Sequence, residues 1–432
     1  MRKNQYYKKA KSMILGGNML LSKRPEMFLP EFWPSYFQSS KNITVTDLDN
    51  KKYIDMICAV GTNILGYANP KIDKKVIQII KKGNMTTLNC PEEVKLSEEL
   101  LKIHKWASLC KFCRSGGEAN AIAIRIARSL NKKTNVAICG YHGWHDWYLA
   151  ANLKNKKLDN HLLPKLEPVG VPKNLKSSVF PFEYNDFSQL AMLVKKKNIG
   201  VIKMEVARNN PPNISFLKKV RNLCNKNKII LIFDECTSGF RTNLGGMHLK
   251  TGVNPDILLL GKALGNGYAI NAILGKKKIM ENASQSFISS TFWTERIGYV
   301  AALATLNEMK KLKPWKKINR MGRYIKSKWI KIAHKNDLKI NVSGIDAIIS
   351  FNFMEKNNLI YKTYITQEML KRGFLASNLI YLNIHHNQKI VDLYLKNLEI
   401  VFKNLSRKII SKKFKSMLNG PVCHGTFKRL ND

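Results

Sequence analysis

The chain has 432 residues, 44% of them hydrophobic, and a formal net charge of +43. This length allows a large buried core and more than one domain. No run of about 18 or more apolar residues occurs, which excludes a transmembrane helix and predicts no membrane partner. The basic start of the chain lacks a following apolar stretch, so we expect no secretory signal and a soluble, cytoplasmic protein.

The positive charge is spread along the chain. Lysines come in short runs such as Lys195–Lys197 and Lys276–Lys278, without interleaved aromatic residues. A nucleic-acid surface normally gathers its basic residues on one face, so we expect no nucleic-acid partner. The field of so many lysines would instead speed the arrival of anionic small molecules.

The first predicted element is a hairpin over residues 42–57, where the Asp49-Asn50 pair separates two runs of strand-forming residues. From about residue 110, short apolar runs alternate with helical patterns such as Glu118–Leu130 and Phe216–Asn227. The runs predict strands covered on both faces, namely Val136–Cys139, Val201–Glu205, Ile229–Asp234 and Ile257–Leu260. Strands that alternate with helices predict a mainly parallel sheet in an α/β domain.

After about residue 310 the pattern changes to helix, strands and helix, which predicts a smaller α+β C-terminal domain. We therefore expect three parts: an N-terminal segment with the hairpin over residues 1–65, a large domain over 66–305 and a small domain over 306–432. Cys110 and Cys113 form a C-x-x-C that could be a redox pair or half of a zinc site. A structural zinc needs four ligands, and because no second pair completes the set we predict no metal.

Polar features follow several predicted strands, at the edge where open α/β sheets bind ligands. Ser115-Gly116-Gly117 follows the apolar segment Leu109–Cys113 and opens a helix. Small residues there leave backbone N–H groups free to meet an anion such as a phosphate, although an ordinary strand-to-helix turn is the alternative. Tyr141-His142 follows the next strand and can stack on a planar ring or form a half-buried aromatic cluster.

Two further strand ends carry charged residues. Asp234 closes a very apolar strand, where a carboxylate is costly unless it has a cationic partner such as a protonated pyridine nitrogen. Such a charge-assisted hydrogen bond contributes about 1.5–3 kcal/mol, whereas the alternative is a solvated acidic loop. Lys262 enters a Gly-rich loop 28 residues later, and partial desolvation of a lysine favours Schiff-base chemistry.

The order and spacing of these four features match the pyridoxal-5′-phosphate (PLP) enzymes of fold type I. The sequence resembles the class III aminotransferases over nearly the whole chain, most closely the glutamate-1-semialdehyde 2,1-aminomutase-like branch. The family motifs S-G-T-E-A, Y-H-G, F-D-E-V-x-x-G-F-R and L-G-K-x-x-G-x-G appear at Ser115–Ala119, Tyr141–Gly143, Phe233–Arg241 and Leu260–Gly267. The resemblance implies a PLP-binding large domain, aspartate aminotransferase-like, and a smaller C-terminal domain.

The resemblance also implies a role for each matched residue. Gly116 and Gly117 bind the PLP phosphate through backbone N–H groups, and Tyr141 covers one face of the ring. Asp234 pairs with the pyridine nitrogen, while Lys262 forms the Schiff base and later shuttles the proton. The implied cofactor-binding set is Ser115, Gly116, Gly117, Tyr141, His142, Glu205, Asp234, Lys262 and Thr291, and the implied catalytic set is Lys262, Asp234 and Tyr141.

Thr291 would reach the phosphate of the other subunit's cofactor, which implies a homodimer. Two departures from the family pattern stand out. Gly117 replaces the usual Thr of the phosphate loop, so one hydroxyl contact is lost. The family's E-P-V-x-G-N is here Glu205–Asn210, with Asn209 and Asn210 also compatible with a simple turn.

The segment Ser290–Gly298 separates the possible reactions. True aminomutases carry a segment like G-T-x-S-G-N-P there, whereas this chain has Trp293 and the Glu295-Arg296 pair. A similar W-T-E-R-I-G segment occurs in aminotransferase-like members associated with sugar and surface-polysaccharide pathways. Arg296 could clamp a donor carboxylate bidentately or belong to a structural Glu–Arg pair.

We therefore predict transamination from an amino acid donor to a carbonyl acceptor, possibly of a sugar pathway, with the aminomutase reaction that makes 5-aminolevulinate as the alternative. A third reading is a basic binding protein without catalysis. The presence of both Lys262 and Asp234 argues against it, because a binding role needs neither.

Overall fold

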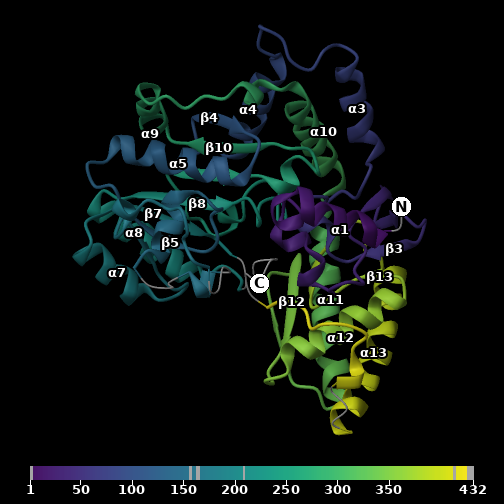
Figure 1. Ribbon diagram of the computed structural model, residues 1–432. Helices are drawn as coiled ribbons and strands as arrows, with labels where there is room; N and C mark the ends of the chain where they lie inside the picture. Colours follow the sequence, from purple (N-terminus) through teal and green to yellow (C-terminus); the bar gives the residue numbers. More distant parts are fainter. Residues whose placement is uncertain (1–2, 155–157, 162–165, 208–209, 412–414, 426–432) are drawn as a thin grey trace. The chain divides into compact units, whose positions relative to one another are not determined.

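The computed structural model describes residues 3–154, 158–161, 166–207, 210–411 and 415–425 (Figure 1). The chain forms two compact units, one made of residues 1–69 and 314–432 and the other of residues 70–313. The three-part division predicted from the sequence, with boundaries at residues 65 and 305, stays a prediction about domains. Among the described residues, no helix combines the length and the apolar character needed to cross a membrane.

The second unit is built on a seven-stranded sheet with the order β4-β10-β9-β8-β7-β5-β6. In this sheet β10 runs antiparallel to both of its neighbours, β4 and β9, and the other neighbouring strands pair in parallel. Every residue of β7, β8 and β9 is buried, which explains the apolar residues that make up most of these strands. The strands are β4 (Leu109–Cys113), β5 (Asn135–Cys139), β6 (Val179–Pro181), β7 (Ile199–Glu205), β8 (Ile230–Glu235), β9 (Ile257–Leu260) and β10 (Asn271–Gly275).

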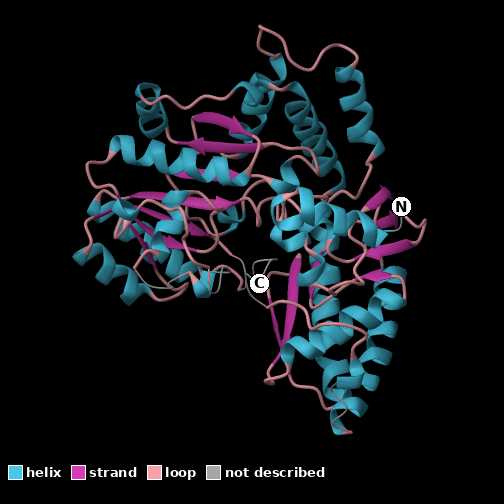
Figure 2. Ribbon diagram, viewed as in Figure 1, coloured by secondary structure: helices cyan, strands magenta, loops and turns pink. Residues whose placement is uncertain are grey.

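Helices cover this sheet, as Figure 2 shows, and confirm the predicted α/β class. Helix α5 packs across β4, β10, β9, β8 and β7, and α7 and α8 pack against β7 and β8. The predicted helices begin two residues earlier than expected, because Ser115 and Asn213 cap them. The helices are α3 (Pro70–Ile80), α4 (Pro91–Ile103), α5 (Gly116–Leu130), α6 (Asp146–Leu149), α7 (Phe187–Lys196), α8 (Ile214–Asn227), α9 (Lys277–Glu281) and α10 (Arg296–Leu312).

The first unit contains two smaller sheets. The predicted hairpin is present as β2 (Thr44–Asp47) and β3 (Lys52–Asp55), and the Asp47 Oδ1 atom accepts the backbone N–H of Lys51 at 2.9 Å across the turn. Strand β1 (Phe37–Lys41) extends the hairpin on one side, and β13 (Phe374–Leu375) pairs in parallel with β3 on the other. The N-terminal hairpin and the C-terminal part of the chain therefore share one sheet.

The second sheet of this unit has the order β11-β12-β14 and is antiparallel. It lies among the helices of the C-terminal part, so the predicted order of helix, strands and helix is present. The remaining elements are β11 (Ile340–Ser343), β12 (Ile348–Phe353), β14 (Leu379–Tyr381), α1 (Lys3–Met13), α2 (Cys58–Gly61), α11 (Pro314–Lys335), α12 (Asn358–Lys371) and α13 (Gln388–Ile410).

Candidate active site

The sheet of the second unit brings the predicted site residues to one edge. Strands β5, β7, β8 and β9 run parallel, and β4 has the same direction because it and β9 both pair antiparallel with β10. The carboxyl ends of these strands lead to Ser115, Tyr141, Glu205, Asp234 and Lys262. Ligands of open α/β sheets bind at such an edge.

The turn after β4 is a capped helix start. The Ser115 Oγ atom accepts the backbone N–H of Glu118 at 3.3 Å, and the Glu118 carboxylate accepts the backbone N–H of Ser115 at 2.8 Å. This capping box satisfies two of the amides at the end of the helix. Gly116 and Gly117 are the first two helical residues, where backbone N–H groups have no acceptor within the helix. Their amides and the helix dipole suit an anionic phosphate.

Gly117 lies against the loop that follows β5. A Cβ atom on Gly117 would lie 2.8 Å from His145 Cε1, and one on Gly143 would lie 3.1 Å from the Gly117 Cα atom. The Trp144 and His145 rings stack with centroids 4.4 Å apart. Because the His145 ring fills the space that the usual Thr would need, the close approach explains the glycine. His145 was not among the predicted site residues. The signal that could have pointed to it is the glycine at position 117, where the family motif has Thr.

Glu205 holds the loop that carries Tyr141. The Glu205 Oε2 atom accepts the backbone N–H of Tyr141 at 3.1 Å. Gly140 has a φ of +107°, and a Cβ atom there would lie 2.5 Å from the same oxygen. The half-buried Tyr141 ring packs edge-on against Tyr148, with centroids 6.1 Å apart. Glu205 thus orients the loop from the end of the neighbouring strand.

Asp234 is buried in a cluster of polar side chains. The His142 Nδ1 atom lies 2.9 Å from the Asp234 Oδ2 atom, and the backbone N–H of Cys236 donates to Oδ1 at 3.1 Å. The Nζ atom of Lys203, which has no exposed surface, lies 3.9 Å from Oδ2. Burial alone would raise the pKa of Asp234, but the charge of Lys203 and the hydrogen bond from His142 hold it well below its usual range. The carboxylate is therefore ionised.

Lys203 was not among the predicted site residues. The prediction of a continuous apolar run over Val201–Glu205 is wrong at Lys203. A lysine inside a strand that is buried on both faces was the signal that could have identified it.

Lys262 begins a short 3-10 turn, Lys262–Leu264, directly after β9. Its φ is +43°, a left-handed conformation that is unusual for a residue with a side chain and that occurs at functional sites. The half-buried side chain donates from Nζ to the Thr237 Oγ1 atom at 2.7 Å. Thr237 follows β8 and was not among the predicted site residues. Burial raises the pKa of the nearby Cys236 thiol well above its usual value, so this thiol stays neutral.

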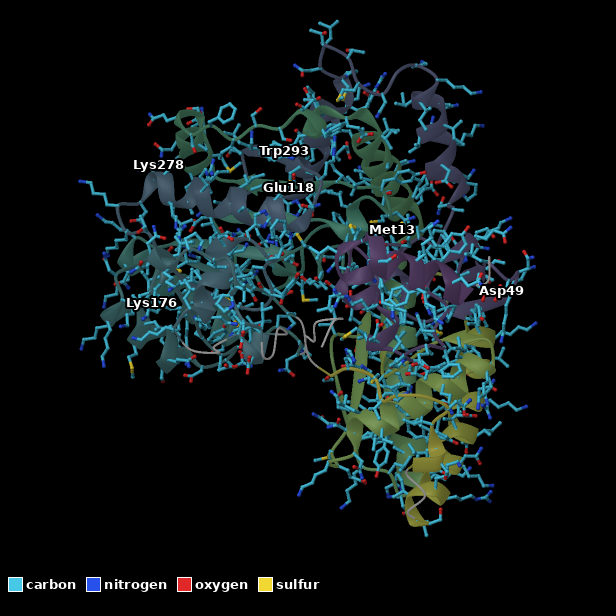
Figure 3. All side chains as sticks on the ribbon, in the orientation of Figure 1. Met13, Asp49, Glu118, Lys176, Lys278 and Trp293 are labelled. Carbon is cyan, nitrogen blue, oxygen red and sulfur yellow. The ribbon has the colours of Figure 1, made fainter. Side chains whose placement is uncertain are left out.

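The segment around Trp293 is joined to the start of α5. The Trp293 Nε1 atom donates to the Glu118 Oε1 atom at 3.0 Å, and Figure 3 shows the two side chains next to each other. Glu295 caps α10 by accepting the backbone N–H groups of Ile297 and Gly298. The bulky Trp293 thus lies beside the capping box that precedes the phosphate-binding glycines.

Arg296 makes a bidentate pair with Glu92 of α4, at 2.8 and 2.9 Å. This contact lowers the pKa of Glu92 below its usual value. A structural Glu–Arg pair is therefore present, but its acid is Glu92 rather than Glu295. The guanidinium is engaged by this carboxylate rather than presented to a donor substrate.

The remaining predicted residues are placed more simply. Thr291 is exposed at the start of the turn Thr291–Thr294. Asn210 is exposed, whereas Arg208 and Asn209 lie outside the described residues. Cys110 and Cys113 are free thiols, and no group of three or more His, Cys, Asp and Glu residues in the described part of the chain could hold a metal ion.

Comparison with known proteins places this chain in a family. The sequence profile of the aminotransferase class-III family matches residues 32–383. The 3-aminobutyryl-CoA aminotransferase of Cloacimonas acidaminovorans is 32% identical over 376 residues, which cover 85% of this chain and 87% of that protein. The glutamate-1-semialdehyde 2,1-aminomutase of Wigglesworthia glossinidia brevipalpis is 31% identical over 434 residues, which cover 94% of this chain and 98% of that protein.

Comparison with solved structures shows which fold the chain has. The structure of the PLP internal aldimine form of the FumI protein of Sphingopyxis sp. MTA144 superposes with a TM-score of 0.85 at 23% identity, over 95% of this chain and 98% of that one. This likeness confirms the fold type I architecture predicted from the sequence. The chain therefore belongs to the class III aminotransferases, a family of PLP-dependent enzymes, as its four motifs predicted.

Proposed function

We propose that this protein is an aminotransferase that uses PLP to move an amino group from an amino acid to a carbonyl acceptor. The observation that carries the proposal is the edge of the sheet, where a buried, ionised Asp234 and the strand-end Lys262 lie beyond neighbouring strands β8 and β9. The residues at this edge fit the cofactor. They offer backbone N–H donors for its phosphate, an aromatic side chain for its ring and a carboxylate for its ring nitrogen. Bound PLP supplies an electron sink when its ring nitrogen is protonated.

In this proposal the amides of Gly116 and Gly117 hold the phosphate at the start of α5. The capping box of Ser115 and Glu118 fixes the direction of those amides. Tyr141 contacts the face of the ring, and Glu205 orients the loop that carries it. His142 contributes through its contact with Asp234, which orients the carboxylate toward the ring nitrogen.

Asp234 and Lys262 are the proposed catalytic residues. The ionised carboxylate of Asp234 would hold a proton at the ring nitrogen. The Lys262 amine would hold the cofactor and would move the proton of the substrate Cα atom. The contact of Lys262 with Thr237 holds the amine at the loop that follows β8.

Transamination is favoured by the placement of Trp293. The indole is bonded to Glu118 and occupies a position near the phosphate turn where the true aminomutases carry small residues. The aminomutase reaction stays as a second candidate because the aminomutase of Wigglesworthia matches 94% of this chain. We also propose a more specific acceptor, a carbonyl compound of a sugar pathway. This part of the proposal rests on the W-T-E-R-I-G segment alone.

A homodimer in the cytoplasm completes the proposal. Thr291 is exposed, as a residue that contacts the cofactor phosphate of another subunit would be in one isolated chain. Mixing Lys262→Ala and Thr291→Ala subunits tests the shared site, because the hybrid holds one site with both changes and one with neither. Activity above that of either parent supports sharing, and activity no better than the parents contradicts it.

The main experiment combines a spectrum with product analysis. The purified protein should absorb visible light, and borohydride should fix the cofactor to the peptide that contains Lys262. Addition of glutamate should release 2-oxoglutarate and leave the aminated cofactor until a carbonyl acceptor arrives. A label on another lysine would refute the role of Lys262. Rapid conversion of glutamate 1-semialdehyde to 5-aminolevulinate, without a half-reaction from any common amino donor, would refute transamination.

A further inference from the structure

Lys203 is a buried lysine whose placement the proposed reaction does not explain. It lies within β7, its side chain has no exposed surface, and its Nζ atom has no hydrogen-bond acceptor among the residues that the structure describes. A lysine ammonium carries three donors, and burying it without a partner is costly. The apolar residue that a doubly covered strand normally carries would avoid this cost.

Lys203 forms an ion pair with the carboxylate of Asp234. The Lys203 Nζ atom lies 3.9 Å from the Asp234 Oδ2 atom, on the oxygen that also faces His142. The other oxygen, Oδ1, accepts the backbone N–H of Cys236. One carboxylate is thus shared between a histidine and a lysine before any ligand is added.

Burial and the neighbouring charges act in opposite directions on the two basic groups of this cluster. Burial lowers the pKa of Lys203, and the negative charge of Asp234 opposes that effect. Burial also lowers the pKa of His142, and the charge of Lys203 lowers it further, while Asp234 raises it. The other titratable groups that act on these residues are Glu205 of β7, Cys236 after β8 and His161, which faces His142.

We propose that Lys203 is a positioning residue that acts through Asp234, keeping the carboxylate ionised and weakening the hold of the cofactor ring nitrogen on its proton. The inference rests on the proposed pairing of Asp234 with that nitrogen. Two cations that share one carboxylate repel each other, so each lowers the proton affinity of the other. Lys203 therefore sets how basic the ring nitrogen is, without contacting the cofactor.

The test follows the protonation of the ring nitrogen directly. Wild-type protein and the Lys203→Met variant are loaded with PLP labelled with ¹⁵N in the ring, and the nitrogen chemical shift is recorded against pH. Methionine matches the length of lysine without its charge. We expect the variant to keep the ring proton to a pH about one unit higher, a tenfold gain in proton affinity. Identical titrations of the wild type and the variant would overturn the inference.

Lys276→Met is the matched control. Lys276 pairs with Asp256 at 2.7 Å, so the change also removes a lysine from a lysine–aspartate contact. Asp256 precedes β9, whereas Asp234 lies at the carboxyl end of the parallel strand β8, which puts the control at the opposite edge of the sheet. The control should titrate as the wild type does, and an equal shift in it would show a general charge effect and overturn the inference.

Two more variants keep the outcomes distinct. Lys203→Gln retains a polar end without the charge and should shift the titration in the same direction, which covers a failure of the methionine variant to fold. Asp234→Asn should remove the ring proton in the neutral range. If Asp234→Asn has no effect, the proposed pairing of Asp234 fails. If Asp234→Asn acts and both Lys203 variants titrate as the wild type does, the role of Lys203 alone fails.

Discussion

Asp234 and Glu235 are consecutive carboxylates at the end of β8, and they face opposite sides of the sheet because strand side chains alternate. Both are buried, and each lies beside the Nδ1 atom of a histidine, at 2.9 Å for His142 and 2.7 Å for His248. Glu235 also accepts the Ser238 hydroxyl and the backbone N–H groups of Met247 and His248. In the described part of the chain, Asp234 accepts one backbone N–H, that of Cys236, and the Nζ atom of Lys203 lies 3.9 Å away without a hydrogen bond.

The difference shows how one strand end serves both structure and chemistry. Neighbouring donors fill the acceptor capacity of the Glu235 carboxylate, so these hydrogen bonds contribute to the free energy of unfolding. Asp234 is kept ionised by nearby charges while its oxygens make fewer bonds, so it can take a further cationic donor. Changing the two residues separately should therefore affect activity in one case and stability in the other.

The largest expected effect is on activity. Asp234→Asn removes the charge at nearly constant shape, so the ring nitrogen loses the anion that keeps it protonated. We expect the half-reaction with an amino donor to slow by about a thousandfold or more, or about 4 kcal/mol of barrier. Stopped-flow absorption measures this rate, and circular dichroism checks the fold. A variant with near-native turnover would rule out the proposed role.

Glu235→Gln should act on stability instead. It removes the charge that His248, Ser238 and two backbone amides satisfy, at an expected cost of about 2–3 kcal/mol in the free energy of unfolding. Urea unfolding measures this loss, and the half-reaction rate should stay within several-fold of the wild type. A thousandfold loss of rate without a loss of stability would contradict the division between the two carboxylates.

The same pair predicts a pH dependence. Burial alone would raise the pKa of Glu235, but the hydrogen bond from His248 and the backbone donors hold it below the usual value. A carboxylate with a lowered folded pKa stabilises the protein above its unfolded pKa, and this stability is lost as pH falls through the folded value. We expect unfolding free energies to fall less steeply below about pH 4.3 in Glu235→Gln than in the wild type. Parallel curves would contradict this expectation.

A smaller effect is expected at the phosphate turn, where the space available at Gly117 should affect the affinity for PLP. Gly117→Thr restores the family's usual residue, but its Cβ atom would meet the His145 ring at 2.8 Å. We expect PLP to bind about tenfold more weakly to the apoprotein, measured by equilibrium titration, because the ring must move. Adding His145→Ala should remove the conflict and recover affinity. Full affinity of Gly117→Thr alone would show that the close approach is not limiting.

The smallest effect is expected at Arg296. Because its guanidinium is paired with Glu92, Arg296→Met should cost about 1 kcal/mol of stability and leave the KM for the amino donor nearly unchanged. Lys310, which pairs with Glu99 near the other end of α10, provides a comparable ion-pair variant as a control. A KM that rises tenfold or more in Arg296→Met alone would support a carboxylate clamp over the structural pair.

The sequence by itself determined the family, the α/β class and the strands that end at the site. Four motifs in a fixed order carried this information, because a strand buried on both faces needs a continuous apolar run and its end needs polar residues. Asp234 and Lys262 could be identified in this way, since Asp234 follows such a run directly and Lys262 follows one after a single glycine. The capped start of α5 was also predictable in outline, as Ser115 and Glu118 have the spacing of a capping box.

Only the tertiary structure decided which side chains meet across separate strands. The contact of Lys203 with Asp234 depends on the pairing of β7 with β8, and the contact of Arg296 with Glu92 on the packing of α10 near α4. The close approach of His145 to Gly117 likewise joins two loops that follow different strands. A sequence pattern indicates which segments are buried. Which side chains contact each other depends on distances between strands and loops, and only the folded structure sets these distances.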